Sequence, residues 1–124
     1  MRRVAVTGIG VISPIGNDKD TFWNNVKNGV CGIGEVTRFD ARDYSCRVAG
    51  EVKDFEAEKY MDKKEARRMD RYTQFAVAAA KMALDDSKID LENTDLYRVG
   101  VITGSGIGGI ETFEIQHRNL LEKG

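Results

Sequence analysis

Short apolar runs alternate along this chain with amphipathic stretches. Residues 3–7 and 99–103 each form an apolar run rich in β-branched residues, and a glycine-rich stretch follows each of them directly. Runs of this length and composition predict buried strands that end at the following glycine. Residues 46–52 predict a further short strand, whereas residues 32–45 show no period and are expected to be irregular.

Helical patterns occupy much of the remaining chain. The first predicted helix runs through Phe22 and Val26. Asp18 or Asp20 is expected to cap its N-terminus, and Gly29 is expected to end it.

The longest predicted helix begins near Lys63 and continues to about Asp86. Its apolar residues recur at spacings of three and four, which places them on one face of the helix. The alanines on that face allow another backbone to approach closely, as a helix buried against a sheet requires. The residues of this face are Met69, Tyr72, Ala76, Ala79, Ala80 and Ala83.

A final helix is predicted over Ile110–Leu121, after the glycine-rich turn Gly104–Gly109. Because strands alternate with helices, the fold class is predicted to be α/β. Two clear apolar strands are few for a complete parallel sheet with helices on both faces, so we expect an incomplete sheet. A length of 124 residues allows one domain with a core, and residues 1–124 are treated as one unit without separate domains.

Composition and charge argue against several classes of function. Charged residues make up 31% of the chain and hydrophobic residues 41%, and the formal net charge of −1 gives no general attraction for nucleic acid or an anionic membrane. The longest apolar run, Phe75–Ala80, is too short to span a bilayer. Residues 4–14 are interrupted by glycine and proline, unlike a signal peptide. We therefore expect a cytoplasmic protein with no nucleic-acid or membrane partner.

Nucleophiles and metal ligands are sparse. Cys31 and Cys46 are the two cysteines, and His117 is the single histidine. This set disfavours a disulfide framework and a structural zinc site. Neither cysteine has a predicted helix N-terminus or a base beside it that would favour a thiolate. We therefore predict no catalytic residue in this chain and no metal or other cofactor.

The turn Gly104–Gly109 satisfies the pattern G-x-G-x-x-G between a predicted strand and a predicted helix. Such a turn can aim backbone N–H groups at a phosphate, so a nucleotide-binding domain is one hypothesis. Its test is a ribose-binding carboxylate on a following strand, and the sequence ends before such a strand. Ile110 and Glu111 also stand where a P-loop carries Lys and Ser or Thr. The alternative is that the glycines only allow a tight turn.

Four basic residues of the long predicted helix follow the spacing i, i+3, i+4, i+7. They share one face, which lies about 120° from the alanine face. One interpretation is a solvated outer surface whose charge Glu65 and Asp70 moderate. The other is a docking surface for an acidic partner. The four residues are Lys64, Arg67, Arg68 and Arg71.

Three stretches, taken in order, resemble the β-ketoacyl-(acyl-carrier-protein) synthases. Residues 4–16 are similar to the opening strand and loop of that family, residues 68–87 to its long alanine-rich helix, and residues 100–109 to the strand and turn that follow. Each match alone is weak, but the three in this order cover nearly the whole chain. Ile107 makes the Gly-Ser-Gly-Ile-Gly-Gly turn more similar to the type II elongating enzymes (synthase II) than to type I.

The resemblance implies a thiolase-like layered α/β fold, of which this chain is the N-terminal portion with its alanine-rich helix buried. It also implies a homodimeric parent acyltransferase of fatty acid biosynthesis, without metal or bound nucleotide. Such an enzyme moves an acyl group from acyl carrier protein to a cysteine and condenses it with the carbanion formed from malonyl-loaded carrier protein. By the same resemblance, Ile107 lines or gates the acyl pocket. The residues that meet the acidic carrier protein are then Lys64, Arg67 and Arg68.

The sequence departs from the family because it lacks the catalytic residues. The family's nucleophile lies in a Thr-Ala-Cys-Ser-like motif and its two histidines lie further on, and Cys31, Cys46 and His117 match none of these positions. We therefore expect the 124 residues alone to be inactive, and a non-catalytic carrier-binding module is the alternative. Missing partner strands would leave apolar surface exposed, so self-association is also expected.

Overall fold

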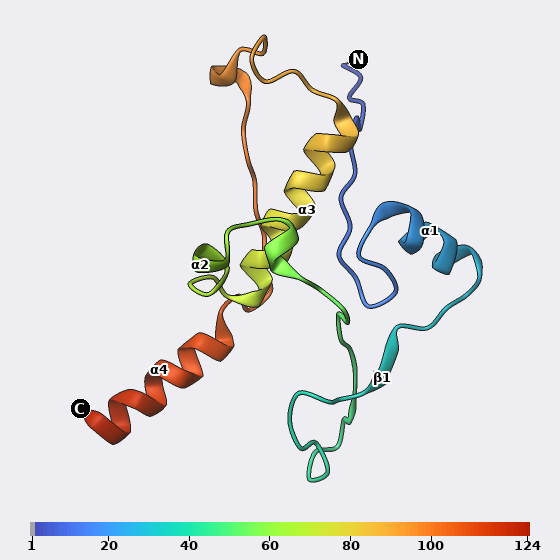
Figure 1. Cartoon of the computed structure of the whole chain (residues 1–124). Helices are drawn as coiled ribbons and strands as arrows, with labels where there is room; N and C mark the ends of the chain where they lie inside the picture. The colour runs from blue at the N-terminus through green and yellow to red at the C-terminus, as the bar shows by residue number, and fades with distance from the viewer. Residues whose placement is uncertain (1) are drawn as a thin grey trace.

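The computed structural model describes residues 2–124 as helices joined by long extended segments, with one small sheet (Figure 1). Helix α3 lies near the middle of the molecule, and the other elements are arranged around it. The elements in chain order are α1 (Lys19–Lys27), β1 (Ile33–Glu35), β2 (Val48–Gly50), the 3₁₀ helix η1 (Ala57–Lys59), α2 (Lys63–Ala66), α3 (Arg71–Ser87), the 3₁₀ helix η2 (Leu96–Arg98) and α4 (Ile110–Lys123).

Helix α1 begins and ends close to the positions that the sequence predicted. Asp18 is its N-cap, and the Oδ1 atom of this residue accepts a hydrogen bond from the backbone N–H of Thr21 at 2.8 Å. The helix ends at Lys27, and Gly29 follows with a φ of +64°, which glycine adopts without steric cost. Of the two candidate caps, Asp18 therefore holds the position, and Asp20 lies in the first turn.

The sheet formed within residues 2–124 is an antiparallel pair of β1 and β2. Ile33 pairs with Gly50, and Glu35 pairs with Val48. The strand predicted within residues 46–52 is thus confirmed, whereas β1 lies in a stretch that was predicted to be irregular. With only three residues and a central glycine, β1 carries no strand pattern of its own, so its conformation depends on pairing with β2.

The strands predicted over residues 3–7 and 99–103 are wrong as secondary structure. Neither segment forms a ladder, and their side chains are exposed: Val4 by 95%, Val101 by 85% and Ile102 by 100%. A strand needs a neighbouring strand to pair its backbone N–H and C=O groups, and no other segment of residues 2–124 supplies one. The layered parallel sheet of the predicted α/β fold is therefore not formed by the described residues.

The helix predicted over residues 63–86 is two helices, α2 and α3, separated by a turn. Asp70, the N-cap of α3, has a ψ of 151°, which interrupts the helical path. The side-chain amide of Gln74 donates to the carbonyl oxygens of Ala66 at 2.8 Å and Met69 at 3.2 Å, so it satisfies carbonyl groups at the end of α2 and in the turn. Helical periodicity continues across this turn, which is why the sequence did not reveal the break.

One side of α3 receives the N-terminal loop, as the alanine pattern predicted. Gly8 lies against the backbone at Ala83, and Gly10 lies against the backbone at Ala79. A Cβ atom at either glycine would overlap the helix. The close backbone approach is therefore confirmed, although a loop makes it in place of a sheet.

The rest of the predicted alanine face is not covered. Of the predicted face, Ala76 and Ala80 are exposed and Tyr72 is 44% exposed, whereas the fully buried alanine of α3 is Ala78, which the prediction did not include. The prediction of a wholly buried face is wrong because residues 2–124 cover only part of the helix. The buried hydrophobic residues of the described chain are Ala41, Met61, Ala66 and Ala78.

Candidate functional site

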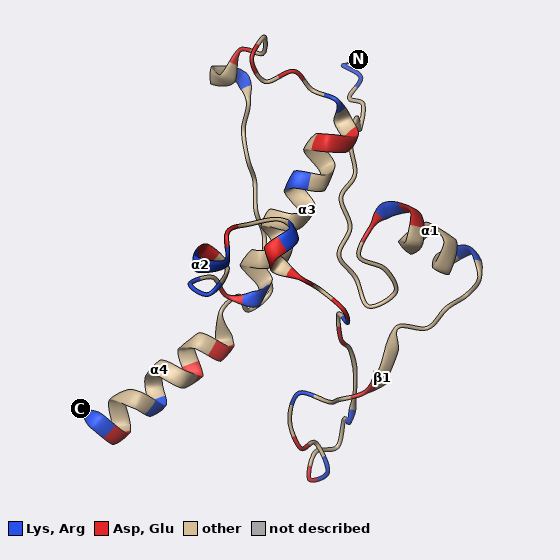
Figure 2. Ribbon diagram, viewed as in Figure 1, with Lys and Arg blue, Asp and Glu red and all other residues tan. Residues whose placement is uncertain are grey.

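Three of the four basic residues predicted to share a face are exposed around α2, and we call them the docking stripe. Lys64 lies in α2, Arg67 is the C-cap of this helix, and Arg68 lies in the turn that follows. Within residues 2–124, none of these three side chains forms an ion pair. Figure 2 shows basic positions (blue) together with the acidic Glu of α2 (red) on α2 and its turn, beside α3. The positive charge of the docking stripe is therefore available to a partner.

Arg71, the fourth basic residue, does not share this surface, which corrects the prediction of one continuous stripe. Its guanidinium group donates to the carbonyl oxygen of Val52 at 3.1 Å. It also lies 4.9 Å from the ring centroid of Phe75 and 5.9 Å from that of Phe55, in cation–π contacts. The break between α2 and α3 separates Arg71 from the other three residues, so its charge holds the segment after β2 against α3.

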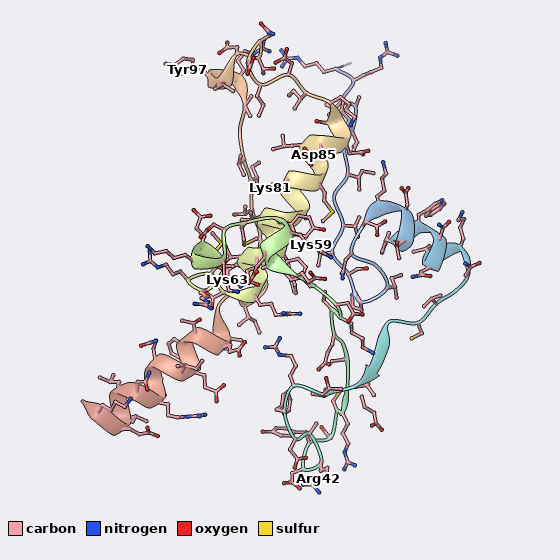
Figure 3. All side chains as sticks on the ribbon, viewed as in Figure 1. Arg42, Lys59, Lys63, Lys81, Asp85 and Tyr97 are labelled. Atoms are coloured by element: carbon pink, nitrogen blue, oxygen red, sulfur yellow. The ribbon has the colours of Figure 1, made fainter. Side chains whose placement is uncertain are left out.

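Neighbouring lysines differ from the docking stripe because they are paired within the chain. Lys59 lies 2.9 Å from a carboxylate oxygen of Glu56, and Lys63 lies 3.1 Å from one of Glu58. Figure 3 shows both lysines in the region of α2 and α3. Exposed pairs of this kind contribute little to stability, but each carboxylate offsets the charge of its lysine. Sequence spacing alone could not distinguish these paired lysines from the unpaired stripe.

The turn Gly104–Gly109 precedes α4, as predicted, and the structure explains why two of its positions are glycine. Gly108 has a φ of +75°, and a Cβ atom there would lie 3.6 Å from the ring of Tyr72. Gly109, the N-cap of α4, is so close to the carboxylate of Asp70 that an added Cβ would lie 2.8 Å from the Cγ atom of that residue. These contacts support the interpretation of a tight turn.

The carboxylate of Asp70 lies at the start of α4, where a nucleotide-binding turn would place a phosphate. Its Oδ1 atom accepts a hydrogen bond from the hydroxyl group of Thr112 in the first turn of α4. A negative charge held at this helix N-terminus would repel a phosphate, and the strand that a dinucleotide-binding fold places before the turn is not formed by residues 99–103. The geometry therefore disfavours the nucleotide-binding hypothesis.

Ile107 lies in this turn immediately before Gly108, and 78% of the residue is exposed. The described part of the chain does not enclose it, so its role in an acyl pocket stays a prediction. The docking stripe is linked to this region along the chain, because Arg68 lies two positions before Asp70, whose carboxylate contacts Gly109 and Thr112. The contact of Asp70 with Thr112 spans 42 residues, and no spacing rule in the sequence indicated it.

The cysteines and the histidine take no part in this arrangement. Cys31 and Cys46 are free and exposed, and the ring of His117 stacks on that of Phe113 with their centroids 6.2 Å apart. Residues 2–124 contain no group of three or more His, Cys, Asp or Glu placed to hold a metal ion. Within the same range, no helix has the length and apolar composition needed to cross a membrane.

The sequence matches a family model and curated relatives over nearly its whole length. Residues 1–123 match the family model described as the N-terminal domain of β-ketoacyl synthase. The 3-oxoacyl-[acyl-carrier-protein] synthase 2 of Staphylococcus aureus (strain N315) is 53% identical over 123 residues, which are 99% of this chain and 30% of that protein. The synthase of the same name from Synechocystis sp. (strain ATCC 27184 / PCC 6803 / Kazusa) is 48% identical over 123 residues with the same coverage. The chain thus spans 30% of the length of these relatives.

Solved ketosynthases have a similar arrangement of elements. The ishigamide ketosynthase/chain length factor aligns with a TM-score of 0.75 and 30% identity, over 94% of this chain and 29% of that one. A type II polyketide-synthase acyl-carrier protein in complex with its ketosynthase bound to the hexaketide also gives a TM-score of 0.75, with 27% identity, over 96% of this chain and 30% of that one. The resemblance seen in the three sequence stretches is confirmed, and the chain belongs to the β-ketoacyl synthase family.

Proposed function

We propose that the chain forms the N-terminal part of a 3-oxoacyl-(acyl-carrier-protein) synthase of the elongating type, with a thiolase-like layered α/β fold in the parent protein. The observation that carries this proposal is the 53% identity to the Staphylococcus aureus synthase over 99% of the chain. The parent enzyme would take an acyl group from acyl carrier protein and condense it with a malonyl-derived unit in fatty acid biosynthesis. We propose a cytoplasmic homodimer as its working form.

In this proposal residues 2–124 supply surfaces, and the reacting groups lie in the rest of the parent enzyme. A nucleophilic cysteine needs a helix N-terminus or a neighbouring base that favours its thiolate, whereas Cys31 and Cys46 are exposed and lie outside the helices. We expect no carbon–carbon bond formation by the 124-residue chain alone. Its exposed segments 3–7 and 99–103 are the surfaces that the rest of the fold would cover, and they make self-association of the isolated chain expected.

The docking stripe is the proposed contact with acyl carrier protein. Lys64, Arg67 and Arg68 are exposed and have no ion-pair partner within residues 2–124. One solved structural neighbour is a ketosynthase in complex with a type II acyl-carrier protein. An acidic partner would be steered toward such a stripe, and salt would screen this attraction.

Ile107 is proposed to line or gate the acyl pocket of the parent enzyme. The two glycines after it are held against the N-terminal end of α3, whereas the isoleucine itself is largely exposed. An apolar side chain in this situation is available to pack against an acyl chain or against a pocket wall supplied by the rest of the enzyme. Its size would then affect which acyl chains are accepted.

Charge reversal tests the docking stripe. In titrations with acyl carrier protein at low ionic strength, Arg67→Glu and Arg68→Glu are each expected to weaken binding on the order of tenfold, because each replaces an attraction by a repulsion. Arg118→Glu on α4 is the matched control, since it makes the same charge change at an arginine that is paired with Glu114 at 2.9 Å. Equal weakening by all three variants, or binding that does not depend on salt, would contradict the proposal.

A non-catalytic carrier-binding module is the second candidate function. It is favoured by one observation: the docking stripe lies wholly within these residues, whereas the family's nucleophile motif is absent from them. Reading the gene beyond codon 124 separates the two functions. A continuing frame with a Thr-Ala-Cys-Ser-like motif and later histidines supports the synthase. A stop codon at this point, together with carrier binding by the chain, supports the module.

A further inference from the structure

We propose that Asp70 is a positioning residue that fixes the Ile107 turn in front of α4, and so helps to set which acyl chains the parent synthase accepts. The inference rests on the proposed role of Ile107 in the acyl pocket. Asp70 stands out because it is the N-cap residue of α3, and yet its side chain makes no capping hydrogen bond to that helix. Aspartate is a preferred N-cap because it makes that bond, so the use of its carboxylate elsewhere needs a reason.

The carboxylate of Asp70 contacts α4 in place of its own helix. Its Oδ1 atom accepts the hydrogen bond from the hydroxyl group of Thr112, and its Cγ atom lies within 2.8 Å of the position that a Cβ atom on Gly109 would take. Two residues further along α3, the ring of Tyr72 lies 3.6 Å from the position of a Cβ atom on Gly108. The start of α3 therefore lies directly against Gly109 and close to Gly108, the two glycines that follow Ile107. We call Asp70, Thr112 and Gly109 the α3–α4 clamp.

The rest of the turn has no comparable support. No atom lies within 4 Å of a Cβ atom built on Gly104 or Gly106. The other contact at the start of α4 is an ion pair between Arg38 and Glu111 at 3.0 Å, and the side chains of these two residues are 48% and 65% exposed. A carboxylate beside a helix N-terminus is also favoured by the helix dipole, which adds to the hydrogen bond. The α3–α4 clamp is therefore the point at which the turn is held, two residues after Ile107.

The hydrogen bond between Thr112 and Asp70 can be removed by changing either residue in the full-length synthase. Asp70→Ala and Thr112→Val are each expected to change the ratio of kcat/KM for a long and a short acyl-carrier substrate by about two- to tenfold, the range expected for the loss of one hydrogen bond. Thr112→Ser keeps the hydroxyl group and is expected to keep the wild-type ratio. Because both single changes remove the same contact, the double variant is expected to change the ratio no more than either one. An unchanged ratio in Asp70→Ala and Thr112→Val would overturn the inference.

Two further variants separate positioning from other effects. Asp18→Ala removes the N-cap of α1, and it is expected to lower stability without changing the ratio of kcat/KM for the long and the short substrate. A change in this variant as large as that in Asp70→Ala would assign the effect to general destabilisation and overturn the inference. Ile107→Ala tests the proposed function itself. If Ile107→Ala changes the ratio and Asp70→Ala does not, the pocket role stands and only the clamp fails. If Ile107→Ala has no effect, both proposals fail.

Hydrogen exchange gives a readout that does not depend on activity. In the 124-residue chain, Asp70→Ala is expected to raise the exchange rate of the Phe113 amide, which donates to the carbonyl oxygen of Gly109 at 3.0 Å, by about two- to tenfold relative to Asp18→Ala, because the end of the turn loses its contact with α3. Rates that stay equal in the two variants would show that the α3–α4 clamp does not restrain the turn, and would overturn the inference even where the enzyme variants fail to fold.

Discussion

Residues 8–16 and residues 99–107 each contain a glycine-rich stretch after an apolar run, and their surroundings are very different. Gly10 lies against the backbone of α3 at Ala79, and the side-chain amide of Asn25 on α1 donates to the carbonyl oxygen of Ile15 at 2.6 Å. The later segment has open space around Gly104, and its apolar residues Val101 and Ile102 are 85% and 100% exposed. The first segment is thus held by α1 and α3, whereas the second is held only where it reaches α4.

The same sequence pattern, an apolar run followed by glycines, therefore has two different structural causes in this chain. In residues 8–16, glycine is required by a neighbour that this chain contains, namely the backbone of α3. In residues 100–106, the apolar side chains are exposed and the backbone forms no hydrogen bond within the described residues, so the requirement behind the pattern concerns contacts beyond them. Changes in the two segments should therefore differ in their effect on the stability of the chain.

The largest expected effect comes from adding a methyl group at the close approach. Gly10→Ala would place a Cβ atom on the backbone at Ala79, and we expect it to lower the free energy of unfolding by about 1–3 kcal/mol. Gly104→Ala is the matched control, because nothing lies within 4 Å of its added Cβ, and a change within about 0.5 kcal/mol is expected. Urea unfolding of both variants checks the contrast. Equal losses of stability would mean that the two segments are not supported differently.

The next effect comes from the N-cap of α1, the helix that supports the first segment. Asp18→Ala removes the acceptor for the N–H of Thr21, and we expect the free energy of unfolding to fall by about 1 kcal/mol. Asp18→Asn keeps a side-chain oxygen at the same position, so its loss should be clearly smaller. Urea unfolding and far-ultraviolet circular dichroism measure both. If the alanine variant were as stable as the wild type, the cap would contribute nothing to holding this segment.

Local signals explain which parts of the fold the sequence predicted. Helix α1 was predicted because its cap and its terminating glycine lie within a few residues of the helix. The break before α3 was missed because it depends on Gln74 reaching back to Ala66, and periodicity contains no such information. Residues 3–7 and 99–103 were predicted as strands because they carry strand composition, but pairing requires a partner that the described residues do not supply.

The sequence predicted the candidate site only in part, as it did the fold. Sequence spacing identified the docking stripe, but it also included Arg71, which packs on Phe55 and Phe75. Whether a charge is free or paired depends on contacts between elements, and spacing within one helix does not determine them. Helical spacing indicates Asp70 as a charge that moderates the basic stripe, and it cannot reveal the contact with Thr112, which forms between two helices that are distant in the sequence.

A smaller effect is expected from pH at the contact between the N-terminal loop and α3. A hydrogen bond from Lys19 and a second from the backbone N–H of Ile9 lower the pKa of Asp86. A carboxyl group whose pKa is lower in the folded state stabilises that state above its unfolded pKa, about 3.9, and loses this contribution as the pH falls through the folded value. Asp86→Ala should therefore be less stable than the wild type at pH 7, and the difference should shrink below pH ~4.

The neighbouring Asp85→Ala is the control for this pH experiment, because the side chain of Asp85 is exposed and forms no ion pair within residues 2–124 (Figure 3). Urea unfolding between pH 7 and pH 3 measures both variants. A stability difference for Asp86→Ala that persists unchanged to pH 3 would show that its charge does not hold the loop.

The smallest effect on stability is expected in the unsupported segment. Ile102 is fully exposed, so Ile102→Lys should change the free energy of unfolding by no more than about 0.5 kcal/mol. Because the substitution adds a charge to an exposed apolar run, it should reduce self-association of the chain, measured by sedimentation velocity over a range of concentrations. Asn24→Lys adds the same charge on the exposed surface of α1 and should leave association unchanged. A marked loss of stability in Ile102→Lys would mean that residues 99–103 are buried in solution, and the contrast between the two segments would then be wrong.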